Sequence, residues 1–90
     1  MSSLRTIKKD IDFLVAEVIS DCWVFVYLNP NKKTEEALAV INEAVDLRNE
    51  LYDRVNNPDK ENIKKHYVAI NADLLKGVDS LFLKISDLAK

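Results

Sequence analysis

Two carboxylates interrupt the most apolar stretch of the chain. Glu17 and Asp21 are four residues apart within Phe13–Leu28, so a helix would place them one turn apart on the same flank. Inward-facing carboxylates of a helical bundle can bind metal, and di-iron bundles combine them with Glu-x-x-His pairs. The chain has one histidine and no such pair. We therefore expect no metal and no other cofactor, and we expect this flank to meet Arg48 or a lysine of a neighbouring helix.

The single histidine, His66, follows Lys64 and Lys65 directly. Nucleophilic catalysis would need a nucleophile and an orienting acid close to the imidazole, and the spacing of the sequence indicates neither. We therefore expect His66 at the surface or at the edge of the core, and we predict no catalytic residue.

The segment Ala72–Gly77, ADLLKG, resembles the Ala-His-x-Leu-Lys-Gly signature of histidine phosphotransfer domains, which are also small helical bundles. Asp73 stands where those domains carry the phosphorylated histidine. A carboxylate has no imidazole to phosphorylate, so the resemblance implies a helical bundle without phosphohistidine chemistry.

A second resemblance starts at Leu4-Arg5 and continues at Ile11-Asp12, which look like the opening of the all-α chorismate mutases. Those enzymes are short three-helix chains that dimerise through a long first helix. The resemblance implies a dicarboxylate pocket, with three candidate anion-binding residues: Arg5, Arg48 and Arg54. Ser20-Asp21 stands roughly where that family has a second arginine, and an unpaired buried carboxylate is costly. A small-molecule enzyme or anion binder of this type is the alternative function.

Three long segments carry apolar residues at alternating intervals of three and four, which is the spacing of a helical core stripe. Asn29-Pro30 and Asn57-Pro58 separate them, because the residue before proline avoids the helical conformation. We predict one domain with helices over about 3–28, 34–55 and 59–88. Short links make neighbouring helices antiparallel, so the predicted fold is an all-α, up-down-up three-helix bundle. As a whole, the chain is similar to short all-helical proteins without an assigned activity.

The predicted core comes from one stripe on each helix. Gly77 in the third helix costs about 1 kcal/mol relative to alanine, so we expect a bulky neighbour there, and Trp23 and Phe25 are the candidates. The residues that we expect to be buried are Leu14, Val18, Phe25, Leu38, Ile41, Leu51, Ile70, Leu74 and Leu81.

The composition narrows the classes of partner and the compartment. A net charge of −2 from 13 basic and 15 acidic residues gives no general attraction to nucleic acid. A membrane-spanning helix needs about 20 mainly apolar residues, and Glu17 and Asp21 fall in the middle of the one apolar run. A single cysteine, Cys22, cannot form an internal disulfide and fits a reducing compartment. We therefore expect a cytoplasmic protein that binds neither nucleic acid nor membrane.

The first helix has more apolar surface than a three-helix bundle needs. Its core stripe, which includes Leu14, Val18 and Phe25, already supplies one broad apolar face, and a second stripe lies nearly opposite. Aromatic residues around small ones are typical of a protein interface. We predict a protein–protein interaction or self-association module, either a homodimer or a complex with a partner helix. In the other interpretation, the remaining helices cover the second stripe as internal core. The stripe consists of Phe13, Ala16, Ser20, Trp23, Val24 and Tyr27.

Overall fold

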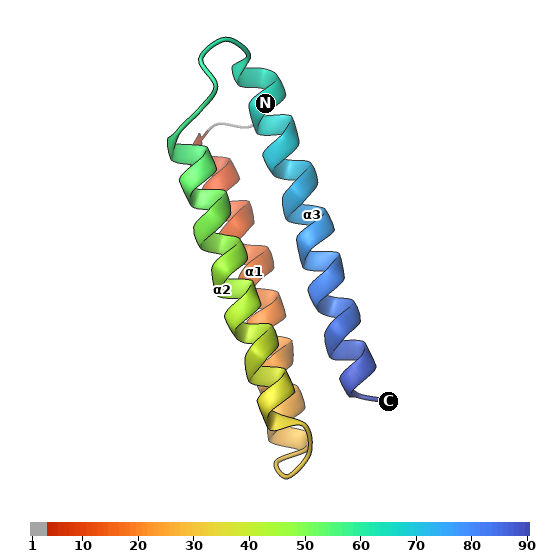
Figure 1. The fold of residues 1–90 in the computed structure, drawn as a ribbon. Helices are drawn as coiled ribbons and strands as arrows, with labels where there is room; N and C mark the ends of the chain where they lie inside the picture. Colours follow the sequence, from red (N-terminus) through yellow and green to blue (C-terminus); the bar gives the residue numbers. More distant parts are fainter. Residues whose placement is uncertain (1–3) are drawn as a thin grey trace.

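The protein, studied as a computed structural model, is described over residues 4–90, with side chains described from Thr6 onward. This part of the chain forms three helices and no strand: α1 (Leu4–Leu28), α2 (Thr34–Asn56) and α3 (Ile63–Leu88). Consecutive helices run in opposite directions side by side, with α1 and α3 pointing down and α2 pointing up in Figure 1, and each contacts the other two. The bundle measures 50 × 19 × 18 Å. The prediction of an all-α three-helix bundle is confirmed. None of the described helices has the length and apolar character that a membrane span requires.

The first connection is held by local hydrogen bonds. Asn29 follows the last residue of α1, and both its backbone N–H and its side-chain amide donate to the carbonyl of Phe25, at 2.9 and 3.1 Å. Lys33, just before α2, has a left-handed backbone with φ of 55°, a conformation that costs a non-glycine residue roughly 1–2 kcal/mol. The chain therefore reverses direction within five residues at the expense of some backbone strain.

Helix α3 begins at Ile63, four residues later than the start predicted near residue 59. Asp59 explains part of the difference, because its side chain accepts a hydrogen bond from the backbone N–H of Glu61 at 3.0 Å and holds a turn there. Asn62 explains the rest, because its side chain caps the helix by accepting from the N–H of Lys65 at 3.2 Å. Short polar side chains compete with the helical backbone in this way, so the predicted first turn of α3 is a capped turn instead.

The core lies between the inner stripes of the three helices. Six of the residues predicted to be core are buried: Val18, Phe25, Leu51, Ile70, Leu74 and Leu81. Leu14 and Ile41 are half-buried against the core. The prediction for Leu38 is wrong, because its side chain is 39% exposed. Its neighbour Ala37 faces inward, and consecutive helical residues point about 100° apart, so the two cannot both face the bundle axis.

At Gly77 a side chain of α2 packs directly against the backbone of α3. A Cβ atom added at this position would lie 2.9 Å from a methyl carbon of Leu47, which is closer than ordinary van der Waals contact. The predicted close approach is present, but the neighbour is Leu47 and not Trp23 or Phe25. Phe25 is buried elsewhere on α1, and Trp23 is exposed, so neither residue explains the glycine.

Candidate interaction surface

The six residues of the second stripe lie on the outside of α1, and together they are called the α1 outer face below. The structure leaves all six side chains exposed. The largest are open to solvent: Tyr27 is 83% exposed, Phe13 65%, Trp23 53% and Val24 52%. The interpretation that α2 and α3 cover this stripe is therefore wrong, since the stripe is not part of the internal core.

The direction of the α1 outer face follows from helix geometry. Ser20, at its centre, is two residues from Val18 and two from Cys22, and both of these side chains are fully buried. Two residues turn a helix by about 200°, so Ser20 points almost directly away from the bundle axis. Phe13 and Tyr27 lie seven residues on either side of Ser20, which is close to two turns, so they share its direction. The row that they form contains no charged member.

Two residues of α2 extend this surface sideways, and the sequence did not single them out as surface residues. Leu38 and Val45 are both 39% exposed. Contacts from α1 residue 12 to α2 residues 48 and 52 fix the antiparallel register of the two helices, which brings Val45 to the level of Ala16 and Leu38 to the level of Trp23. The apolar character of Leu38 alone predicted burial. Its exposure could be predicted only from knowledge of which side of α2 borders α1.

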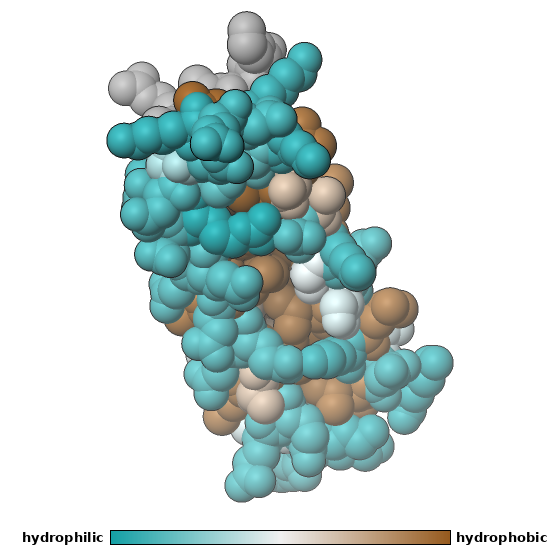
Figure 2. Space-filling view, turned by 45° about the horizontal axis from the view of Figure 1, so that its top comes forward, coloured by the Kyte–Doolittle hydropathy of each residue, from teal (hydrophilic) through white to brown (hydrophobic). Residues whose placement is uncertain are grey.

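The side of α2 and α3 that faces the viewer in Figure 1 is more hydrophilic than the α1 outer face. Figure 2 shows it, tilted forward, as a mostly hydrophilic face on which hydrophobic side chains are visible chiefly along a furrow. Exposed apolar residues of α3, such as Val68, Leu75 and Leu83, are aliphatic and include none of the large aromatic side chains found on the α1 outer face. Single exposed apolar side chains are ordinary on a protein surface, whereas a row of them indicates an interaction site.

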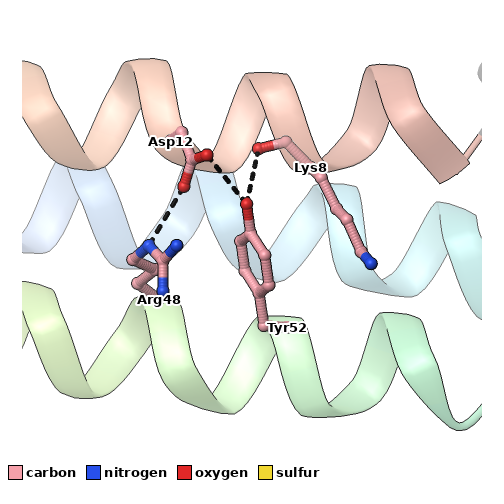
Figure 3. Close-up of polar contacts among 4 residues, drawn as sticks. All are labelled: Lys8, Asp12, Arg48 and Tyr52. Atoms are coloured by element: carbon pink, nitrogen blue, oxygen red, sulfur yellow. Dashed lines mark hydrogen bonds and ion pairs between the residues drawn. The ribbon is translucent and has the colours of Figure 1, made fainter.

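A polar cluster joins α1 to α2 near one end of the bundle (Figure 3). One carboxylate oxygen of Asp12 accepts a hydrogen bond from Arg48 Nε at 3.0 Å, and the other accepts from the Tyr52 hydroxyl at 2.8 Å. The Arg48 guanidinium also stacks over the Tyr52 ring, 4.2 Å from its centroid. Partial burial raises the pKa of Tyr52, and the hydrogen bond to Asp12 raises it further. The predicted partner for Arg48, the flank of Glu17 and Asp21, is therefore wrong.

The side chains of Glu17 and Asp21 make no hydrogen bond or ion pair with any other residue that the structure describes. Both are exposed at the border of the α1 outer face. Within the described part of the chain, no group of three or more histidine, cysteine, aspartate or glutamate residues is placed to hold a metal ion. These two carboxylates therefore act as a solvated edge.

Arg54, another of the predicted anion-binding residues, lies in an ion pair between α2 and α3. Arg54 Nη1 donates to the Asp73 carboxylate at 2.7 Å, so Asp73 has an arginine partner at the position that resembles a phosphotransfer signature. His66 Nε2 lies 2.7 Å from the backbone carbonyl of Arg54, near the end of α2. A carbonyl only accepts, so this nitrogen carries the proton and donates. Lysine, arginine and histidine side chains satisfy the last carbonyls of a helix in this way.

The three predicted anion-binding residues are not brought together. Arg48 points to α1 and Arg54 to α3, each into an ion pair, and the side chain of Arg5 lies outside the described residues. A shallow hollow of about 270 Å³ does occur between α2 and α3, but no arginine lines it. Its charged lining is Glu36, Glu43, Asp87 and Lys84, and Lys84 is paired with Glu43. This lining is suited to repel a dicarboxylate.

Comparisons of the chain with protein-family models, curated proteins and solved structures found no match. The resemblances to chorismate mutases and to histidine phosphotransfer domains therefore stay hypotheses from the sequence.

Proposed function

We propose that this protein is a small self-association module that works through the α1 outer face. The observation that carries the proposal is the uncharged row from Phe13 to Tyr27, which points away from the core and stays uncovered in the single chain. Burial of apolar area releases roughly 25 cal/mol per Å², so an exposed row of this kind favours association. A bundle that needed only its own core would have polar residues here.

The residue types on this face support an interface. Phe13, Trp23 and Tyr27 supply the large aromatic side chains that dominate the energy of protein interfaces. Ala16 and Ser20 lie between them and are small, so a second helix can approach closely. Packed helices have axes 8–10 Å apart, depending on the side chains at the contact. The same face therefore combines large aromatic side chains that a partner can bury with small residues that let a partner helix come close.

The alternative function, an enzyme or anion binder, has less support. Such a site needs cations that converge on a concave pocket. Arg48 and Arg54 instead serve ion pairs with Asp12 and Asp73 on opposite seams of α2. Recruiting them for a ligand would first break those pairs, so the geometry favours the interaction module. The proposal includes a cytoplasmic location, because the lone thiol of Cys22 fits a reducing compartment.

Trp23 provides the experiment, because it is the only tryptophan of the chain and belongs to the α1 outer face. Dilution from high to low micromolar concentration should shift its emission to the red and increase its quenching by acrylamide, as a covered indole becomes exposed. Circular dichroism at each concentration should stay constant, which separates dissociation from unfolding. Emission and quenching that do not change with concentration, together with the mass of a single chain by light scattering, would overturn the proposal.

A further inference from the structure

We propose that the α1 outer face binds α1 of a second copy in the antiparallel direction, with a two-fold axis beside Ser20. The inference rests on the self-association proposed above and adds the arrangement of the two chains. In a two-fold interface the same patch serves both copies, so each contact between two different positions occurs twice. The spacing and sizes of the residues on the face decide between antiparallel and parallel pairing.

The two aromatic residues at the ends of the face are symmetric about Ser20. Phe13 is seven residues before it and Tyr27 seven after it. An antiparallel pair centred on Ser20 therefore sets Phe13 level with the partner's Tyr27 at both ends. Offset or edge-to-face aromatic pairs contribute about 0.5–1.5 kcal/mol beyond the area that they bury. At the centre, two serines face each other, and their small side chains allow the helices to approach.

The flanks of the face distinguish the two directions more sharply. Ala16 and Trp23 are seven residues apart, so they lie within about 20° of each other on one flank. Antiparallel pairing keeps like flanks on the same side, and Trp23 then lies beside the partner's Ala16, a large residue against a small one. Parallel pairing puts opposite flanks together, so Trp23 would meet the partner's Val24 and leave Ala16 beside Glu17. Close packing without overcrowding favours the antiparallel arrangement.

Charges at the border agree with this direction. Lys9 continues the row one turn before Phe13, and parallel pairing would set the two copies of Lys9 against each other. Antiparallel pairing instead sets Lys9 past Leu28, where the partner's α1 ends, and far from the partner's Lys9. It does bring Glu17 of both copies to one edge, but they are then about 9 Å apart along the helix axis alone. That separation is already about one Debye length at physiological ionic strength, so their repulsion is weak.

The area of the face is sufficient for a modest dimer. Each of the three aromatic residues exposes more than half of its surface, and full burial of such a residue removes roughly 150–250 Å². These residues alone supply roughly 400 Å² per copy. Val24, Leu28 and the exposed edge of α2 bring the total toward the roughly 600 Å² per partner at the lower end of stable interfaces. The occupant therefore need not be larger than a second copy of this chain.

Cysteine cross-linking tests the direction. Antiparallel pairing about position 20 sets Ala16 level with the partner's Val24. The two positions lie on opposite flanks, but each is only about 40° from the direction of Ser20, so a disulfide can join them when the helices pack closely, with axes about 8–9 Å apart. Two variants, Ala16→Cys and Val24→Cys, are oxidised mildly, first separately and then mixed, and the products are identified by mass. We expect the mixed disulfide in the mixture and none from either variant alone, because like positions are then about 12 Å apart along the helix axis. The native chain is the control, since its Cys22 is fully buried and should not cross-link.

The outcomes separate the inference from the function on which it rests. Cross-linking of each variant with itself, and no mixed product, would show parallel pairing and overturn the inference. A native dimer in solution without any cross-link between positions 16 and 24 would overturn it as well, and would leave self-association intact. A native chain that is monomeric at all concentrations would overturn both. Circular dichroism of the two variants checks that they fold, and both positions are exposed in the single chain.

Discussion

A Cβ atom on Gly77 would lie 2.9 Å from Cδ2 and 3.0 Å from Cδ1 of Leu47. Helix α3 therefore packs against α2 at a position where it has no side chain, and Leu47 fills the space. Glycine in a helix interior costs about 1 kcal/mol relative to alanine, and this contact explains why the cost is tolerated.

Gly77→Ala should gain less stability in the native background than in a Leu47→Ala background. Alanine improves helix propensity by about 1 kcal/mol, but its methyl group meets the end of Leu47 and overpacks the contact. Urea unfolding of the four chains of this double-mutant cycle measures the coupling. Equal effects of Gly77→Ala in both backgrounds would show that Leu47 does not oppose the added methyl group.

Leu74→Ala should lower the free energy of unfolding by about 2–5 kcal/mol, because the side chain is buried in the core and its removal leaves a cavity. Leu75→Ala is the matched control, since Leu75 is the next residue on α3 and more than half of its surface is exposed. We expect the control to change stability by less than about 1 kcal/mol. Similar losses for both variants, by thermal or urea unfolding, would contradict the orientation of α3.

Stability should fall in the alkaline range, and Tyr52 should account for part of the loss. The pKa of Tyr52 is raised in the folded state, mainly by burial and then by the Asp12 carboxylate, so the folded chain keeps the phenol proton longer than the unfolded chain. The contribution is complete below about pH 10, the ordinary value, and is lost as the pH rises through the raised pKa. Burial and the Asp21 carboxylate raise the pKa of the Cys22 thiol in the same direction.

Tyr52→Phe isolates the first of these groups. Urea unfolding from about pH 9 to about pH 11 should show a steeper loss of stability for the native chain than for this variant, because only the native chain has the phenol proton. Cys22 and the other tyrosines contribute equally to both. Parallel pH profiles would mean that the proton of Tyr52 is not retained in the folded state.

His66→Ala should cost about 1 kcal/mol of stability, the usual net value of one intramolecular hydrogen bond. The side chain donates to the Arg54 carbonyl near the end of α2, and alanine leaves that carbonyl without its partner. Lys64→Ala, on an exposed position two residues earlier, controls for the change in helix propensity. A loss that is no greater for His66→Ala than for Lys64→Ala would argue against the hydrogen bond as a stabilising contact.

Helix positions were predictable from the sequence because apolar spacing and two Asn-Pro breaks determine them. The start of α3 was not, since Asp59 and Asn62 replace its predicted first turn with side-chain hydrogen bonds. Leu38 was misplaced because α2 has paired apolar residues, and only tertiary packing decides which of each pair faces inward. The polar cluster of Asp12, Arg48 and Tyr52 was missed for a similar reason. Arg48 and Tyr52 are four residues apart on α2, whereas Asp12 lies on α1, far from both in the sequence. Contact among the three depends on the register of the two helices.

The α1 outer face was recognisable because a helix in a three-helix bundle needs one apolar face and α1 has two. Whether the second face was covered depended on how far α2 and α3 spread around α1, which periodicity does not encode. The structure leaves Phe13 and Tyr27 open. This exposure excludes the interpretation of the second stripe as internal core and leaves its interpretation as an interface.

The central claim, association through the α1 outer face, is tested most directly by sedimentation equilibrium of three chains: native, Val24→Glu and Val68→Glu. Both substitutions place a charge on an exposed valine of a long helix, Val24 on α1 and Val68 on α3, so they differ mainly in the surface that they change. We predict that the native chain and Val68→Glu sediment as dimers at micromolar concentration and that Val24→Glu sediments as a folded monomer with unchanged helix content. A native chain that sediments as a monomer, or a Val24→Glu variant that stays a dimer, would contradict the account.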